Sequence, residues 1–181
     1  MKKLLLMLLL AGIGSRSLAQ FTQAELHASG LTCAMCSNAI NKALIALPFV
    51  NTVKSDIKNS SFKIVFKDTE SVDIDVVKKA VEDAGFSVAG LKLTGNFQSV
   101  TIGDDKHVNI GKHLYHFLHV GDRVLDGEQT ITVVDKHFVS SKQFKKFMAL
   151  TTMPCLSTGK AGTCCQAEGV KPETRVYHVT I

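Results

Sequence analysis

The N-terminal half of the chain alternates between the hydrophobic spacing of a strand and that of a helix. Apolar residues occupy every second position over 24–28, which predicts a half-buried strand. Over 36–47 they recur at helical spacing on one face, and Pro48 ends the predicted helix. The residues 30–34 are expected to form a loop, so this first strand and helix meet at a short junction.

The following residues predict two more strands, a second helix and a closing strand. Asp73 can cap the helix, because its carboxylate accepts hydrogen bonds from N–H groups of the first turn. Gly85 suits the left-handed position that follows the last turn. The order β-α-β-β-α-β predicts a ferredoxin-like domain over 20–94, with both helices on one side of an antiparallel sheet. We expect the strands at 50–57, 62–66 and 86–93, and the helix at 74–84.

After Thr94-Gly95-Asn96 the pattern changes to short apolar segments that are separated by glycines. It predicts a small β-rich domain over 95–181, a barrel or sandwich that we interpret as OB-like. The chain as a whole is therefore expected to be an α+β protein of two domains. Strands are expected at 100–102, 108–110, 114–120, 130–134 and 175–181, and one helix at 141–150.

Residues 1–19 have the pattern of a cleavable signal peptide. Lys2 and Lys3 precede an apolar run over 4–13, and Ser17-Leu18-Ala19 supplies the small residues of a cleavage site. The apolar run is too short to cross a bilayer as a helix. We therefore predict an exported, periplasmic protein whose mature chain has no transmembrane segment.

Composition and charge exclude several classes of function. Of the 181 residues 45% are hydrophobic and 20% are charged, as in ordinary globular proteins. The formal charge of +5 falls to about +2 without the three cations of residues 1–19. Such a chain lacks the dense basic surface that binds phosphates, so we expect no nucleic-acid partner. No phosphate loop, nucleophile elbow or HExxH motif occurs, and we expect no enzymatic activity.

The strongest chemical signal is the pair Cys33 and Cys36 at the junction of the first strand and helix. Cys33 is expected in the loop and Cys36 in the first helical turn, so that both sulfur atoms point to one side. The N–H groups at a helix N-terminus lower the pKa of thiols there. Thiolates select soft ions such as Cu(I) and Zn(II). Two thiolates on an exposed loop suit an ion that is passed on, rather than a closed zinc site with four ligands.

Residues 22–94 contain the stretches GLTCAMC at 30–36, AINKAL at 39–44 and VEDAGF at 81–86. Through these stretches they resemble the heavy-metal-associated domain family, which includes copper chaperones and the periplasmic mercury-binding protein. The resemblance implies that Cys33 and Cys36 bind one soft ion, Cu(I) foremost and Hg(II) or Zn(II) otherwise. It also implies transfer to a metal-transport or metal-scavenging partner by exchange of thiol ligands. Leu31 stands where the family usually has Met, a change that nearly conserves volume.

Two other functions of the cysteine pair stay open. Cys33 and Cys36 could form a structural disulfide, although so short a loop constrains the unfolded chain only modestly. They could also be the redox pair of a thiol–disulfide oxidoreductase, which likewise places CxxC between a strand and a helix. The β-α-β-β-α-β order and the lack of tryptophan favour metal binding over redox chemistry. Met35 is expected to be an exposed loop residue, with a thioether ligand as the alternative.

The remaining cysteines, Cys155, Cys164 and Cys165, flank a segment rich in Gly, Ser and Thr. The chain has five cysteines, so at least one thiol stays outside an intramolecular disulfide. Export favours a disulfide from Cys155 to Cys164 or Cys165. The alternatives are a second soft-metal site, built from two or three of these thiols, and unrelated buried or free thiols.

Six of the seven histidines also lie in the C-terminal region. On a strand, His113 and His119 would share one face and His116 would point to the other. These three cannot converge on one ion without a bend, so we expect partly exposed strand residues, with a histidine metal site as the alternative. The six are His107, His113, His116, His119, His137 and His178.

Overall fold

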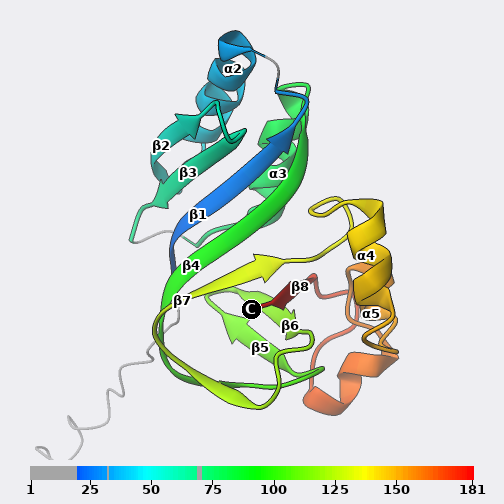
Figure 1. The fold of residues 1–181 in the computed structure, drawn as a ribbon. Helices are drawn as coiled ribbons and strands as arrows, with labels where there is room; N and C mark the ends of the chain where they lie inside the picture. Colours follow the sequence, from blue (N-terminus) through cyan, green and yellow to red (C-terminus); the bar gives the residue numbers. More distant parts are fainter. Residues whose placement is uncertain (1–19, 32, 69–70) are drawn as a thin grey trace, which may run out of the picture.

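The computed structural model describes residues 20–31, 33–68 and 71–181, and the expected signal peptide at 1–19 lies outside them. The first part of the chain has the expected order of elements, β-α-β-β-α-β (Figure 1). Small differences at the ends of the elements leave every expected helix and strand of this part in place. The elements are β1 (Gln20–Ser29), α2 (Ala34–Ile45), β2 (Val50–Asp56), β3 (Ser61–Phe66), α3 (Ile74–Asp83) and β4 (Ser87–Ile102).

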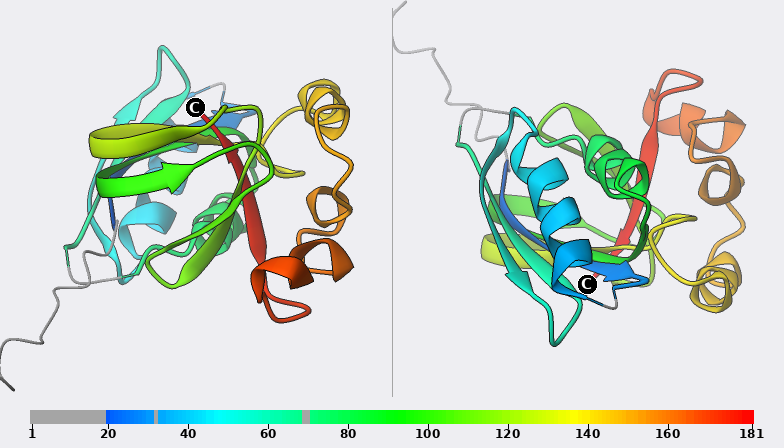
Figure 2. Two further views of the ribbon diagram at one scale, coloured as in Figure 1. Left: turned by 90° about the horizontal axis from the view of Figure 1, so that it is seen from below. Right: turned by 90° about the horizontal axis from the view of Figure 1, so that it is seen from above.

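These four strands form an antiparallel sheet in the order β2-β3-β1-β4. Both helices cover the same face of the sheet, as the right-hand view of Figure 2 shows. The inward positions of the alternating strands and the apolar faces of the helices meet in a buried core. Burial of each large apolar side chain contributes roughly 1.5–3 kcal/mol. Core residues contributed by these elements include Leu26, Ile40, Leu44, Phe62, Ile64, Ile74 and Val81.

The expected boundary at residues 94 and 95 falls within β4, a strand of 16 residues that belongs to both parts of the chain. Its first half pairs with β1, and it also pairs with β7 (Arg123–Val133). The expectation that Thr94-Gly95-Asn96 separates two strands is wrong. A Cβ atom at Gly95 would lie 2.6 Å from the carbonyl oxygen of Gln20, so this glycine permits close approach of β1 rather than a turn.

The C-terminal strands extend the same sheet, whose full order is β2-β3-β1-β4-β7-β8-β6-β5. The separate barrel or sandwich that we expected is not confirmed. The helix expected at 141–150 is present as α4 (Ser141–Met148), and Ser140 caps it in a capping box with Gln143. Two helical segments were not expected, because four to six residues are too few to show a hydrophobic period. The other elements are β5 (His107–Ile110), β6 (His113–Phe117), α5 (Cys155–Thr158), the 3₁₀ helix η2 (Thr163–Glu168) and β8 (Val176–Thr180).

An ionic cluster joins α3 to β8 across the two parts of the chain. The Arg175 guanidinium donates to Asp75 at 2.8 and 3.2 Å and to Asp135 at 2.8 Å. The Tyr177 hydroxyl donates to the carboxylates of Asp73 and Asp75, each at 3.2 Å. Buried residues of both parts also belong to one hydrophobic core. Among the described residues, no helix is long and apolar enough to cross a membrane.

Candidate metal centres

The sulfur atoms of Cys33 and Cys36 lie 2.7 Å apart at the N-terminus of α2. Cys33 is the N-cap residue, and its sulfur accepts a hydrogen bond of 3.3 Å from the backbone N–H of Cys36. Cys36 lies in the first turn of the helix, where its side chain reaches back to the cap. The structure therefore places both residues as the sequence predicts, one before the helix and one inside it.

Hydrogen bonds lower the pKa of the Cys33 thiol. The side chain of Cys36 contributes most to lowering the pKa of Cys33, and the backbone N–H of Cys36 adds to the effect. Both groups stabilise the thiolate, which is the form that binds metals and attacks disulfides. The positive end of the α2 dipole acts in the same direction. Cys33 is thus prepared to lose its proton when a cation or an incoming thiol arrives.

The loop that carries the pair is exposed on its outer side and supported from within. Met35 is 83% exposed, as expected, although it lies in the first turn of α2 and not in the loop. Leu31 and Phe86 are partly buried and pack against the core beneath the loop. Gly30 has a φ of +85°, and a Cβ atom there would lie 3.7 Å from the Phe86 ring. A glycine therefore lets the chain turn over this aromatic ring and bring the cysteines to the surface.

Cys155, Cys164 and Cys165 converge in the C-terminal part, with their sulfur atoms within 4.8 Å of one another. All three are free thiols, so the disulfide that we expected from Cys155 is not formed. The sulfur atoms of Cys164 and Cys165 lie 3.4 Å apart. Cys155 and Cys165 are buried, and burial is the main cause that raises the pKa of each.

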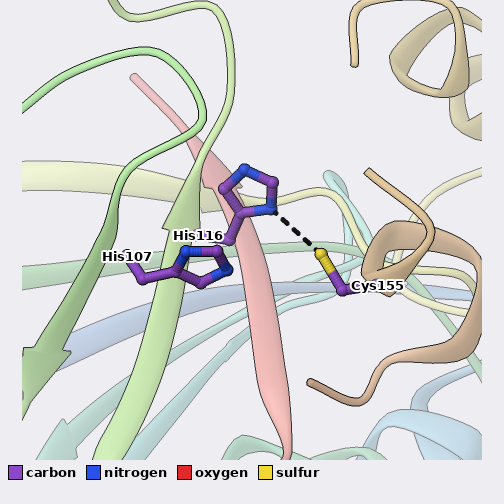
Figure 3. A group of neighbouring side chains, drawn as sticks. All are labelled: His107, His116 and Cys155. Carbon is purple, nitrogen blue, oxygen red and sulfur yellow. Dashed lines mark hydrogen bonds between the residues drawn. The ribbon is translucent and has the colours of Figure 1, made fainter. Parts of the chain in front are cut away.

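Two histidines complete this second cluster, His107 on β5 and His116 on β6 (Figure 3). They face each other across the two strands, and their rings stack with centroids 4.5 Å apart. Nε2 of His107 lies 3.4 Å from the sulfur of Cys165, and Nδ1 of His116 lies 3.6 Å from that of Cys155. Burial, with smaller contributions from neighbouring imidazoles, lowers the pKa of His116 to about 4.

The expectation of partly exposed strand histidines is wrong for His116 and His178, which are fully buried. The prediction that His116 points away from His113 agrees with the structure, in which the His113 ring packs against Tyr177 instead. Sequence spacing did not single out His107 as a partner of His116. The two strands are antiparallel neighbours, and only this pairing brings the residues together.

Comparisons with known proteins recognise the first part of the chain. A sequence model of the heavy-metal-associated domain matches residues 25–87. A probable copper-transporting ATPase of Arabidopsis thaliana, HMA5, is 30% identical over 78 residues, which are 43% of this chain and 8% of the ATPase. The copper chaperone CopZ of Staphylococcus haemolyticus is 29% identical over 63 residues, which are 35% of this chain and 91% of the chaperone.

Solved structures of similar proteins cover the same part. A CopZ metallochaperone is 26% identical, covers 38% of this chain over its own full length and has a TM-score of 0.35. Oxidized MerP from Ralstonia metallidurans CH34 is also 26% identical, with 36% of this chain and 93% of MerP covered and a TM-score of 0.33. The family model identifies residues 25–87 as a heavy-metal-associated domain, and the strands and helices that follow lie outside the matched region.

Proposed function

We propose that this chain binds one Cu(I) ion through the thiolates of Cys33 and Cys36 and passes it to another protein. The observation that carries the proposal is the pair of adjacent sulfur atoms at the exposed N-terminus of α2. Thiolates are soft ligands that favour Cu(I) over hard cations. The similarity to a copper chaperone and to a copper-transporting ATPase supports copper as the cargo. Hg(II) and Zn(II) are the competing soft ions.

The exposure of the pair supports transfer rather than storage. Cys33 is open to solvent, so a thiol of a partner can reach an ion bound there without unfolding the loop. Exchange would proceed by addition of one partner thiolate and release of one thiolate of this chain, which leaves the ion coordinated throughout. The partner is a metal-transport or metal-scavenging protein with its own exposed thiols. The signal-peptide pattern supports export to the periplasm as the place of this exchange.

An anaerobic titration of the reduced full chain with Cu(I), followed by amide NMR shifts, tests the proposal. We expect one equivalent to shift amides of residues 30–40 and to leave those of 155–165 unchanged. Cys33→Ser and Cys36→Ser should each abolish this response. Cys164→Ser makes the same chemical change outside the pair and should retain it.

Two results would contradict the proposal. One is a first equivalent of Cu(I) that shifts the amides of 155–165 and spares the loop. The other is weak Cu(I) binding together with rapid reduction of a model disulfide by Cys33 and Cys36, which would assign the pair to a thiol–disulfide oxidoreductase. Recovery of the expressed chain from the periplasm with Gln20 as its first residue tests export separately, and retention of Met1 in the cytosol would contradict it.

A further inference from the structure

The second cluster brings together side chains from two layers of the C-terminal part. His107 and His116 come from the neighbouring strands β5 and β6, whereas Cys155 comes from α5 (Figure 3). Cys164 and Cys165 come from η2. His107, His116 and Cys155 place their donor atoms within 4.8 Å of one another, as do the three cysteines. Cys155 belongs to both groups, so it lies at the centre of a set of five nitrogen and sulfur donors.

The surroundings of the cluster are those of a protein interior. Leu114, Ala161 and Val176 pack with Cys155 and Cys165 in a small hydrophobic core. Buried free thiols are common in such places, because a thiol behaves as a small apolar group. A fully buried imidazole is different, since its two ring nitrogens need polar partners away from water. His116 is such a ring, and the half-buried ring of His107 stacks on it beside the thiols.

The hydrogen bond to Asp105 orients His116 toward the thiols. Nε2 of His116 lies 3.0 Å from the Asp105 carboxylate, which accepts the proton of that nitrogen in the neutral ring. Nδ1 is then the nitrogen with a free lone pair, and it is the one that lies 3.6 Å from the Cys155 sulfur. Metal-binding histidines generally have such a carboxylate on the nitrogen that does not bind the ion.

We propose that this cluster is a second metal site, which holds one Zn(II) ion through Cys155 and further donors from Cys164, Cys165, His107 and His116. Zn(II) takes four ligands, and mixed sets of thiolates and imidazoles are its usual closed sites in proteins. The exposed cysteine pair offers only two sulfur atoms and suits Cu(I), so the two sites differ in both donor number and donor type. This inference does not depend on the proposed function of Cys33 and Cys36.

Binding of Co(II), a coloured substitute for Zn(II), tests the site in the full chain. The background carries Cys33→Ser and Cys36→Ser, so that the exposed pair cannot contribute, and the protein is kept reduced and free of oxygen. We expect one equivalent of Co(II) to give the intense visible bands of tetrahedral coordination and a thiolate charge-transfer band. Zn(II) should displace Co(II) and abolish both signals.

Single substitutions then identify the ligands. Cys155→Ser should abolish the tetrahedral spectrum, and His107→Gln should weaken binding by roughly tenfold or more. Asp105→Asn should weaken it by roughly 10–100-fold, because Asp105 acts as a positioning residue for His116. His119→Gln is the matched control, since this exposed histidine lies outside the cluster and should leave the affinity unchanged.

A second measurement guards against variants that fail to fold. Zn(II) at roughly a hundredfold excess over its Kd should raise the Tm of the double-serine background by about 5–10 °C. Cys164 is half-exposed, so the Cys164→Ser variant should fold. Zn(II) should nevertheless raise its Tm by less than that of the background. The proposal is overturned by the absence of Co(II) binding, by a spectrum without thiolate charge transfer, by an unchanged affinity in Cys155→Ser, or by binding of Cu(I) alone.

Discussion

Cys33 combines two roles in one side chain, because its sulfur caps α2 and forms half of the proposed copper site. As a cap it accepts the N–H of Cys36, and as a ligand it must be a thiolate. The two roles support each other, since hydrogen bonds that cap the helix also stabilise the negative sulfur. Cys33 is exposed to solvent, and burial opposes the lowering of its pKa less than the hydrogen bonds from Cys36 favour it.

The first prediction concerns the acidity of Cys33. Its rate of alkylation by iodoacetamide, followed by peptide mass spectrometry, should reach half its maximum below the ordinary thiol pKa of 9.0. Cys36→Ala should move this midpoint upward, because the hydrogen bond from the Cys36 side chain is lost. Met35→Ala, a change of the exposed residue beside the pair, should leave it in place. A wild-type midpoint at or above 9.0 would contradict the prediction.

The two clusters differ in how far the sequence predicts them. Cys33 and Cys36 are close in sequence, so local geometry at a helix N-terminus already places their sulfur atoms together. The convergence of Cys155, Cys164 and Cys165 was one alternative suggested by their spacing. His107 lies far from Cys165 along the chain, and the two come into contact only because β5 pairs with β6 and η2 packs beside these strands. The hydrophobic pattern of the individual segments does not predict this pairing.

At the scale of the elements, β4 holds the molecule together by passing without interruption from the first half of the sheet into the second. The N-terminal strands and helices could be predicted because each has a clear hydrophobic period. Capping residues, such as Asp73 for α3, mark the ends of the helices. The course of β4 could not be predicted from the sequence, because Gly95 and Asn96 are residue types that are common in turns. Gly95 is required instead by the closeness of the β1 backbone, a tertiary contact.

The second prediction tests this role of Gly95. Gly95→Ala should destabilise the protein by about 1–3 kcal/mol, because the added methyl group overlaps the carbonyl oxygen of Gln20. Gly90→Ala lies in the same strand, where the nearest atoms are 3.8 Å from the added group, and should change stability by less than about 1 kcal/mol. Urea unfolding measures both. Equal effects of the two substitutions would contradict the prediction, because they would show that the β1 backbone at Gln20 moves to make room for the methyl group.

At the scale of the whole molecule, the ionic cluster around Arg175 fixes the C-terminal strand β8 against the heavy-metal-associated domain. Arg175 contacts Asp75 at the start of α3 and Asp135 after β7, and its guanidinium also lies 4.2 Å above the Tyr177 ring. Burial alone would raise the pKa of Asp75. The hydrogen bonds and positive charge of Arg175, with the Tyr177 hydroxyl, outweigh burial and hold that pKa below its usual value.

The third prediction follows from the sign of this shift. A carboxyl whose folded pKa is lowered stabilises the fold above its unfolded pKa of 3.8, and this contribution is lost as pH falls below that value. Asp75→Asn should therefore lower the free energy of unfolding at pH 7 by about 1–2 kcal/mol, a range that allows for solvent screening. The difference from wild type should be smaller at pH 3 than at pH 7, because the contribution is lost between pH 3.8 and the lower folded pKa.

Urea unfolding at the two pH values measures this difference. Asp83→Asn is the matched control, because Asp83 forms an exposed pair with Lys79 in the same helix and should contribute no more than about 0.5 kcal/mol. A destabilisation by Asp75→Asn that is as large at pH 3 as at pH 7 would show that packing, and not the ion pair, makes Asp75 important.

The central claim is that Cys33 and Cys36 bind Cu(I), and an equilibrium competition with a coloured Cu(I) chelator tests it most directly. The reduced full chain should withdraw one equivalent of Cu(I) from the chelator, and the variant with both Cys33→Ser and Cys36→Ser should withdraw far less at the same concentrations. A double-serine variant that competes as well as the wild-type chain would contradict the account.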